Sequence, residues 1–425
     1  MKEALDSRID LSQYVRNCGM AARTASRIVA QASTGQKNEA LLAMAQAISA
    51  GQSRILEQNR LDVAAGTQQG LADALLDRLE LTPDRVASMV QGLQQVASLP
   101  DPVGEITELN RRPSGIEVGR MRVPLGVIGI IYEARPNVTI DAFSLCFKSG
   151  NTILLKGGSE AINSNRALVK TIRDALAPLG MEDACQFLDS TNRESVLFLL
   201  RQEEDLDLII PRGGEGLIRF VSENSRIPII KHYKGVCHLY VDQDADISMA
   251  ISIAENAKVS RPSVCNALET LLVHRKTASN FLPAFAERMQ QAGVELRGDT
   301  RTRKIVPGLS AATEEDYYSE YLDLILSIRI VKSLDEAVAH IEKYGSSHTE
   351  AIITENYSRS QKFLDCVNSS VVLVNASTRF SDGGQLGLGA EIGISTTRIH
   401  AYGPMGLDEL VTEKFIVFGN GQVRI

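Results

Sequence analysis

The sequence predicts an α/β protein with two doubly wound parallel-sheet domains and a separate β arm. Short apolar runs alternate with amphipathic helical stretches in two series, over residues 127–230 and 238–374. Continuous apolar strands separated by helices are typical of parallel sheets that are covered on both faces. The chain has 425 residues, which exceeds the usual size of one domain and favours two packed units.

The N-terminal part of the chain is predicted to be helical. Apolar residues recur at helical spacing over 20–29, 41–55 and 86–96. Thr82 is a suitable N-cap and Pro83 suits the first helical position, so a helix is expected to begin there. The prolines at 100 and 102 then end the helical pattern.

A hairpin-like segment over 106–123, centred on Arg112–Gly115, is predicted to form an exposed β arm. The elements expected after it are strand 127–131, helix 140–148, strand 152–155, helix 160–176, strands 186–188 and 206–210, helix 216–221 and strand 228–230. The second series is expected to contain strands 238–241, 270–273, 325–331, 351–353 and 371–374.

A last strand over 415–418 lies too far from any helix to complete a βαβ unit, so its natural partner is the arm. Paired arms with an open edge commonly reach another subunit, so a homo-oligomer is expected. The sequence thus divides into a first domain (1–105 with 124–234), a second domain (235–405) and the arm (106–123 with 406–425).

The composition excludes several classes of protein. With 44% apolar and 23% charged residues the chain is globular, and its net charge of −7 argues against a general nucleic-acid binder. No apolar run approaches the roughly 18 residues that a membrane helix needs, and residues 1–6 do not resemble a secretory signal. The six dispersed cysteines fit a reducing cytoplasm, and no His/Cys motif predicts a bound metal.

Two segments are candidates for binding a dinucleotide. Gly213 and Gly214 follow a strand and open a helix, where backbone N–H groups favour an anion, although such loops are often plain turns. Lys156 ends a strand and is followed by Gly157 and Ser159, at the edge of the sheet where ligands bind. No acidic residue stands directly at the strand end to bind a bare ribose, which favours a 2′-phosphate and NADP over NAD.

Two further residues are candidates for catalysis. Cys265 lies in a Pro-containing loop four residues after Arg261, which could favour a thiolate, although most free cysteines are inert. Asn137 follows the first strand of the sheet and could cap the helix that begins at Val138 or donate to an oxyanion. These two roles compete for the same side chain.

Three long stretches carry a resemblance to a known family. They are VPLGVIGIIYEARPNVTIDAFSLCFKSGNTILLKGGSEA at 123–161, SRPSVCNALETLLVH at 260–274, and a pattern from Val331 that includes Tyr344–Glu350. The chain resembles the aldehyde dehydrogenase superfamily, and within it the gamma-glutamyl phosphate reductases, over essentially its whole length. The resemblance implies two sheet domains, one binding NADP and one carrying a nucleophilic cysteine, with an oligomerisation arm.

The resemblance also implies an activity: NADPH-dependent reduction of L-glutamyl 5-phosphate to L-glutamate 5-semialdehyde and phosphate, the second step of proline biosynthesis from glutamate. Cys265 is similar to the catalytic thiol and Asn137 to the oxyanion-hole amide. Lys156 and Glu320 match the residues that hold the two riboses of the cofactor. The sequence does not decide whether the protein forms a transient complex with glutamate 5-kinase, the enzyme that makes this substrate.

One departure from the superfamily is informative. Oxidising aldehyde dehydrogenases carry a water-activating glutamate in a stretch that here reads Lys231–Cys237 and contains no carboxylate. An oxidising enzyme for another aldehyde is the alternative, and this departure argues against it. A non-catalytic relative is a second alternative, which would be expected to have lost Cys265 or Asn137. Arg261 and Ser263 are candidates for holding the substrate phosphate, and Arg379 for the α-carboxylate.

Overall fold

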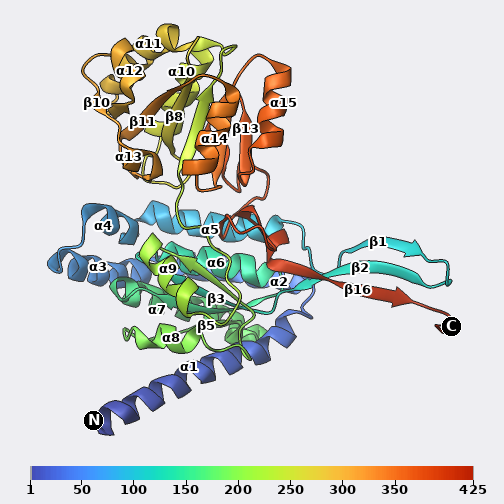
Figure 1. Cartoon of the computed structure of the whole chain (residues 1–425). Helices are drawn as coiled ribbons and strands as arrows, with labels where there is room; N and C mark the ends of the chain where they lie inside the picture. Colours follow the sequence, from blue (N-terminus) through green and yellow to red (C-terminus); the bar gives the residue numbers. More distant parts are fainter. Residues whose placement is uncertain (1, 425) are drawn as a thin grey trace. The chain divides into compact units, whose positions relative to one another are not determined.

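The computed structural model describes residues 2–424 and separates into two compact units (Figure 1). Unit 1 comprises Met1–Lys231, Gly387–Gly393 and Met405–Ile425, and unit 2 comprises His232–Leu386 and Ile394–Pro404. The segment 387–393, expected in the second domain, belongs to unit 1. There Gly389 packs so closely on Leu99 that a Cβ atom would lie 2.5 Å from Leu99 Cδ2.

Unit 1 begins with helices, as the sequence predicts. They are α1 (Lys2–Val29), α2 (Thr34–Ala50), α3 (Gln52–Gln68), α4 (Asp73–Leu79) and α5 (Pro83–Ser98). The predicted start of α5 is confirmed: the Thr82 side chain accepts a hydrogen bond from the Arg85 N–H, and Pro83 is the first helical residue. The helix ends at Ser98 because the following Leu99 precedes a proline.

The sheet of unit 1 has four parallel strands in the order β5-β4-β3-β6. The strands are β3 (Val127–Tyr132), β4 (Thr152–Gly157), β5 (Cys185–Phe187) and β6 (Leu208–Arg212), and the helices are α6 (Asn137–Lys148), α7 (Ile162–Leu176), α8 (Glu194–Leu199) and α9 (Glu215–Asn224). After β3 the chain adds β4 and β5 on one side of it and then β6 on the other side. The loops after β3, β4 and β6 therefore meet at the carboxyl edge of this sheet.

The prediction of a strand at 228–230 is wrong. Only an isolated bridge between Ile209 and Ile229 forms there, with Ile209 N–H donating to the Pro228 carbonyl. Pro228 has no N–H to donate, so the ladder cannot extend through it.

The arm is a three-stranded antiparallel sheet in the order β1-β2-β16 (Figure 1). Its strands are β1 (Ile106–Arg111), β2 (Glu117–Pro124) and β16 (Val411–Phe418). The predicted pairing of the C-terminal strand with the arm is confirmed, and it starts earlier than expected, at Val411. Phe415, Val417 and Phe418 are each more than half exposed, so the arm presents apolar side chains to its surroundings.

Unit 2 contains a seven-stranded parallel sheet in the order β10-β9-β11-β8-β7-β12-β13. The strands are β7 (Cys237–Val241), β8 (Leu268–His274), β9 (Glu295–Gly298), β10 (Ser310–Ala311), β11 (Ile325–Val331), β12 (Thr349–Ile353) and β13 (Val371–Val374). All five predicted strands of this series lie within observed ones. Two strands were not predicted: β9, which lies between β10 and β11 and carries Glu295 and Arg297, and the two-residue edge strand β10.

The helices of unit 2 cover both faces of this sheet. They are α10 (Ile247–Val259), α11 (Ala278–Gln291), α12 (Thr300–Ile305), α13 (Glu314–Tyr318), α14 (Leu334–Tyr344) and α15 (Tyr357–Cys366). Successive residues of β8 enter different cores: Leu271 packs with Phe281 and Phe285, and Leu272 packs with Phe363. Two covered faces explain why these strands read as unbroken apolar runs.

Two short strands, β14 (Gly393–Ser395) and β15 (Gly403–Met405), pair with each other. Among the residues that the structure describes, no helix is both long and apolar enough to cross a bilayer. The predicted fold class, an α/β protein with two parallel sheets, is confirmed.

Candidate active site

The Cys265 loop runs from the end of α10 to the start of β8 and leaves the thiol half-buried. Burial raises the pKa of four other thiols, which are therefore held in the neutral, unreactive form. These four are Cys18, Cys146, Cys185 and Cys237. The remaining thiol, Cys366, is exposed at the end of α15. Cys366 thus belongs to a helix, whereas Cys265 lies in a loop that is held at both ends, by α10 and by β8.

The Lys231–Cys237 stretch lies directly against the Cys265 loop. A Cβ atom on Gly235 would lie 2.0 Å from the Cys265 carbonyl oxygen, so only glycine fits at this close approach. The buried Cys237 thiol donates to the same carbonyl, with Sγ 3.2 Å from the oxygen. These contacts hold the Cys265 backbone in place. They also bring the Lys231–Cys237 stretch, which contains no glutamate, next to the candidate nucleophile.

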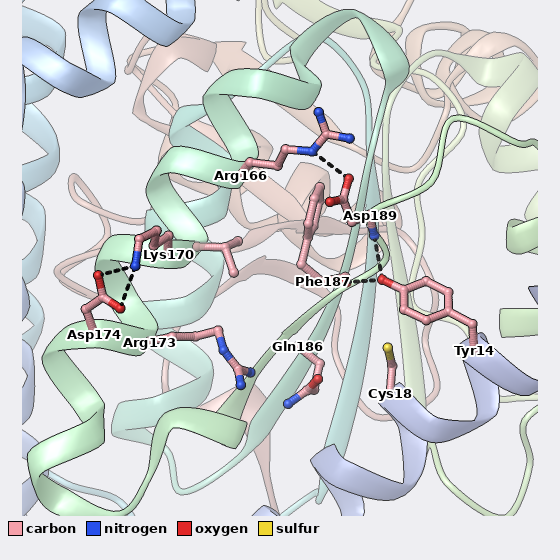
Figure 2. A pocket seen from close by; sticks show the side chains of 10 residues that line it. Tyr14, Cys18, Arg166, Lys170, Arg173, Asp174, Gln186, Phe187 and Asp189 are labelled. Atoms are coloured by element: carbon pink, nitrogen blue, oxygen red, sulfur yellow. Dashed lines mark hydrogen bonds and ion pairs between the residues drawn. The ribbon is translucent and has the colours of Figure 1, made fainter.

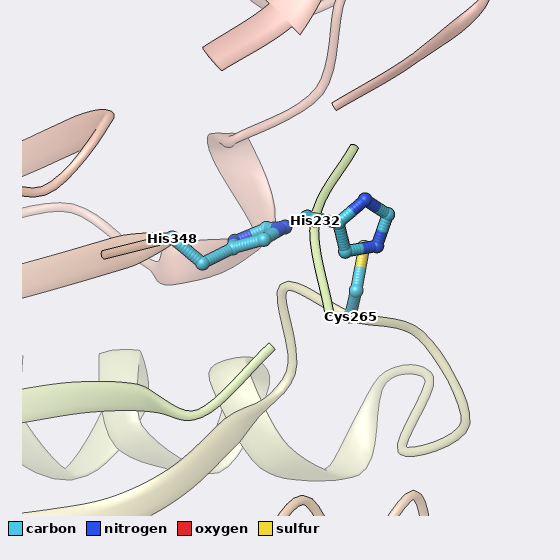
Figure 3. Close-up of side chains that lie close together, drawn as sticks. All are labelled: His232, Cys265 and His348. Carbon is cyan, nitrogen blue, oxygen red and sulfur yellow. The ribbon is translucent and has the colours of Figure 1, made fainter. Parts of the chain in front are cut away.

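Two histidines, neither of them among the predicted site residues, approach the Cys265 thiol (Figure 3). His232, Cys265 and His348 each offer a donor atom, and these atoms all lie within 4.8 Å of one another. The His232 Nδ1–H donates to the Ile394 carbonyl at 2.9 Å, so Nε2 is the nitrogen that carries a lone pair in the neutral ring. A neutral imidazole in this state can accept a proton or bind a metal ion. Both histidines lie in stretches that the resemblance already singled out, which is the signal that could have revealed them.

Basic and amide side chains line the other side of the Cys265 loop. Arg379 donates to the Asn266 amide oxygen, and the Asn266 amide donates to the Ser381 carbonyl at 2.9 Å. Burial lowers the pKa of Arg379, and repulsion from Arg261 lowers it further. Arg261 and Ser263 are themselves exposed at the start of the loop. Arg379 interacts electrostatically with both Arg261 and the Cys265 thiol. The structure thus brings together near Cys265 the three residues predicted to bind substrate, Arg261, Ser263 and Arg379.

Arg379 also faces a small cavity of about 250 Å³. Its lining residues are Asn256, Arg379, Phe380, Asp382 and Gln385. One cation and one anion in the same cavity suit a zwitterionic amino-acid head, with Arg379 for a carboxylate and Asp382 for an ammonium group.

Glu320 lies half-buried in the segment between α13 and β11. Its charge helps to raise the pKa of the neighbouring Glu269 and Cys237. Burial is the main cause for Glu269 and raises its pKa to about 7, although its carboxylate lies 2.7 Å from Lys258 Nζ. The Leu322 N–H donates to Glu269 and ties the Glu320 segment to β8.

Asn137 is not the N-cap that one interpretation of the sequence proposed. It is the first residue of α6, preceded by Pro136 as the N-cap, and its side-chain amide donates to Asp141 Oδ2 at 2.9 Å. Burial raises the pKa of Asp141 to about 6, and the hydrogen bond from Asn137 lowers it in part. The amide is therefore held in place by a carboxyl group one turn along the helix.

Lys156 lies buried near the end of β4, and its Nζ donates to the Gly157 carbonyl at 2.7 Å. Burial lowers its pKa, and attraction to Glu160 offsets this in part. Ser159 beside it is exposed. An acidic residue does lie at this edge: the Glu160 carboxylate accepts the Ala134 N–H at 2.6 Å and fills the space that a Cβ on Gly158 would need.

Gly213 and Gly214 lead into α9, as predicted, and the position expected for an anion is held by a carboxylate. Glu133 Oε2 accepts the Gly214 N–H at 2.9 Å, and a Cβ on Gly213 would lie 2.4 Å from the same oxygen. The backbone cradle at this helix N-terminus thus binds a negative group, which is the property a pyrophosphate requires. Unit 1 gathers Asn137, Lys156, Gly157, Ser159, Gly213 and Gly214 at one sheet edge.

The larger cavity, of about 420 Å³, lies in unit 1 beside Tyr14 and Cys18 (Figure 2). It contains none of the predicted site residues. Its cations are paired with carboxylates, namely Arg166 with Asp189, Lys170 with Asp174 and Arg173 with Asp183. This cavity therefore presents no charge suited to a phosphate.

Comparison with known proteins agrees with this geometry. The model of the aldehyde dehydrogenase family matches residues 10–322. The gamma-glutamyl phosphate reductase of Geotalea daltonii is 57% identical, over 97% of this chain and 99% of its own length. The crystal structure of gamma-glutamyl phosphate reductase from Thermotoga maritima is 48% identical, with a TM-score of 0.95 over 97% of this chain and 100% of that one.

A more distant structure, an engineered glycolyl-CoA reductase with bound NADP⁺, is 16% identical with a TM-score of 0.67, covering 95% of this chain and 96% of that one. At this identity it shows a shared fold alone. The chain belongs to the aldehyde dehydrogenase family and, within it, to the group of gamma-glutamyl phosphate reductases.

Proposed function

We propose that this chain reduces L-glutamyl 5-phosphate to L-glutamate 5-semialdehyde and phosphate, with NADPH as reductant and a thioester on Cys265 as intermediate. The observation that carries the proposal is the half-buried Cys265 thiol, held by two rigid elements and flanked by Arg379, in a close relative of gamma-glutamyl phosphate reductases. This is the second step of proline biosynthesis from glutamate.

In this mechanism the Cys265 thiolate attacks the acyl carbon of the substrate. A new C–S bond forms, the electrons of the carbonyl move onto its oxygen, and the C–O bond to phosphate then breaks. Asn137 and the backbone N–H of Cys265 are proposed to stabilise the oxyanion. The hydrogen bond from Asn137 to Asp141 supports this role, because it holds the amide in one orientation.

Substrate recognition is assigned to the arginines beside the thiol. Arg261 and Ser263, exposed at the start of the loop, are proposed to bind the leaving phosphate. Arg379 is proposed to bind the α-carboxylate, and Asp382 in the same cavity supports a substrate that also carries an ammonium group. A glutamyl group has both charges at one end and the reacting carbonyl at the other.

A nicotinamide cofactor fits the residues at the carboxyl edge of the unit 1 sheet. The Gly213–Gly214 cradle already binds a carboxylate, and the buried Lys156 supplies a cation. Gly157, Ser159 and Lys156 are proposed to hold the adenosine ribose with its 2′-phosphate, and Glu320 the nicotinamide ribose. When bound, the cofactor supplies the hydride that reduces the thioester.

An oligomer joined through the arm and a cytoplasmic location are further parts of the proposal. The exposed apolar residues of β16 support the first, and six free cysteines support a reducing compartment. A complex with the kinase that makes the acyl phosphate would protect that unstable substrate from water.

The direct test runs the reaction backwards. The full-length protein is mixed with glutamate 5-semialdehyde, NADP⁺ and phosphate, and NADPH formation is followed by absorbance. Phosphate-dependent reduction of NADP⁺ is expected. Activity only with other aldehydes, and independent of phosphate, would instead favour an oxidising aldehyde dehydrogenase.

A further inference from the structure

Two histidines to which the proposed mechanism gives no part, His232 and His348, form a group with Cys265 (Figure 3). These residues come from three separate segments, and their donor atoms all lie within 4.8 Å of one another. We propose that this group, referred to below as the His-Cys-His site, binds one zinc ion reversibly and that the bound ion blocks the Cys265 thiol.

Hydrogen bonds orient both imidazoles so that Nδ1 is the donor, which leaves Nε2 as the ring nitrogen for a metal. The Ile394 carbonyl can only accept a hydrogen bond, so His232 Nδ1 carries a hydrogen, and Nε2 is the nitrogen with a lone pair in the neutral ring. For His348, Nδ1 lies 2.8 Å from Thr349 Oγ1, which already donates its single hydrogen to Ser381 Oγ at 2.8 Å. His348 Nδ1 is therefore the donor as well. Metal-binding histidines almost always donate their second ring N–H in this way.

The donor set selects zinc. Two imidazoles and one thiolate are ligands that Zn²⁺ prefers, and three protein ligands leave a fourth position open for water. In a tetrahedral site of this kind neighbouring donor atoms lie about 3.3–3.6 Å apart, from Zn–N and Zn–S distances of about 2.1 and 2.3 Å. The observed upper limit of 4.8 Å requires only small side-chain rotations, since His232 and Cys265 are half-buried.

The surroundings make this site weaker than a structural zinc site. Helix α10 ends at Val259 before the Cys265 loop, and α14 ends at Tyr344 before His348. The negative C-terminal ends of these helices favour a cation. The nearby Arg379 and Arg261 oppose it. Binding is therefore expected to be reversible and to depend on the free zinc concentration.

Zinc bound here would withdraw electron density from the Cys265 sulfur and block its approach to the substrate carbonyl. The inhibition, unlike the binding itself, rests on the proposed function. Metal binding is therefore measured first, on the protein without substrate or cofactor.

Cobalt(II) is a suitable probe, because a thiolate bound to it gives a charge-transfer absorption band in the near ultraviolet. The full-length protein is titrated with Co²⁺ under a thiol-free reductant, and the cobalt is then displaced with Zn²⁺. One equivalent is expected to bind with a charge-transfer band. Cys265→Ala is expected to abolish the band, and Cys366→Ala, which removes the exposed thiol, to leave it unchanged.

The histidines provide the decisive variants. His348→Asn keeps a polar group beside Thr349 and is expected to weaken zinc binding by more than about 100-fold, since even loss of an outer partner costs about 10–100-fold. His232→Asn, at a half-buried position, serves the same purpose if circular dichroism shows that the first variant does not fold. A charge-transfer band that persists in Cys265→Ala, or zinc affinity within about threefold of the parent in the folded histidine variants, overturns the proposal.

A second readout links the metal to the nucleophile. Zinc is expected to slow iodoacetamide labelling of Cys265 in the parent, and EDTA to restore it, with no protection in the folded histidine variant. Zinc that leaves Cys265 labelling unchanged while binding at one equivalent also overturns the proposal. These results are independent of whether the protein reduces L-glutamyl 5-phosphate.

Discussion

The candidate residues of the two units lie at opposite edges of their parallel sheets. In unit 1, Lys156 and Gly213 follow β4 and β6 and lie at the carboxyl edge, where ligands of open α/β sheets normally bind. In unit 2, Cys265 and His348 precede β8 and β12 and lie at the amino edge. The same architecture thus offers two edges with different chemistry.

The difference follows from the direction of the helices. At the carboxyl edge the helices begin, so their N–H groups attract anions, as the Glu133 carboxylate at the start of α9 illustrates. At the amino edge the helices end, which favours cations and neutral donors. A phosphate at the amino edge must therefore be held by side chains, and Arg261 and Arg379 are the cations near Cys265. We expect changes around Cys265 at the amino edge to alter kcat, and changes at Lys156 at the carboxyl edge to alter cofactor affinity.

The largest effect is expected for Cys265→Ala, which removes the proposed nucleophile. Turnover should fall by at least about a thousandfold, as is usual for loss of a covalent catalyst, while circular dichroism and thermal melting stay close to the parent. Cys366→Ala is the matched control, since it removes an exposed thiol at the end of α15, outside the Cys265 loop. Labelling by iodoacetamide with mass spectrometry checks the assignment. Inactivation that tracks labelling of another cysteine would contradict it.

A large effect is also expected when phosphate is omitted from the oxidative direction. With no carboxylate in Lys231–Cys237 to activate water, hydrolysis of the thioester lacks a general base worth about 10²–10⁴-fold. NADP⁺ reduction should stop after about one turnover per site, and arsenate should restore it, because the arsenate ester decomposes in water.

The structure offers another candidate for the general base, because the His232 imidazole lies beside the Cys265 thiol. Sustained oxidation in phosphate-free buffer would contradict the prediction. If His232→Asn then lost this phosphate-independent oxidation, His232 would be identified as the general base.

Gly235→Ala tests whether the amino edge is as tightly fitted as the contacts indicate. The added Cβ would meet the Cys265 carbonyl at 2.0 Å, so the backbone must move, and such displacement of a nucleophile can cost about 10²-fold in kcat. Gly92→Ala in α5 is the matched control, because nothing lies within 4 Å of its new Cβ. Equal kcat for both variants, measured with saturating cofactor, would show that the Cys265 loop adjusts freely.

At the carboxyl edge, Lys156→Met should lower the preference for NADPH. Loss of a charged contact to a 2′-phosphate costs about 1.5–3 kcal/mol, or roughly ten- to a hundredfold in affinity. The effect should appear in KM for NADPH and not in KM for NADH. Lys170→Met, which alters an exposed lysine paired with Asp174, is the control. Equal kcat/KM for NADPH and NADH in the parent would show that Lys156 does not select the cofactor.

The smallest effect on chemistry is expected from the arm. Deletion of Phe415–Phe418 should dissociate the oligomer before it unfolds either unit, because this strand lies at the edge of the arm sheet, paired with β2, and presents exposed apolar side chains. Size-exclusion chromatography with light scattering measures the change. A full-length protein that is monomeric at micromolar concentration would rule out the proposed role of the arm.

The sequence by itself determined the features that depend on local pattern. Apolar runs located the buried strands of both sheets, the Thr82–Pro83 pair located the start of α5, and the position of Cys265 singled it out among six cysteines. Local patterning failed at short polar elements such as β9, and at Pro228, where a strand-like run lacks the N–H needed to pair.

Only the tertiary structure decided which distant residues meet. His232 and His348 lie far from Cys265 along the chain, and no spacing rule joins them, yet parallel strands bring the segments before β7, β8 and β12 to one edge. The same holds for Glu133, whose carboxylate occupies the cradle at Gly214, and for Asn137, whose amide turns to Asp141. Patterns along a chain report the burial and conformation of each segment, whereas the neighbours of a side chain depend on strand order, which is set by packing of the whole unit.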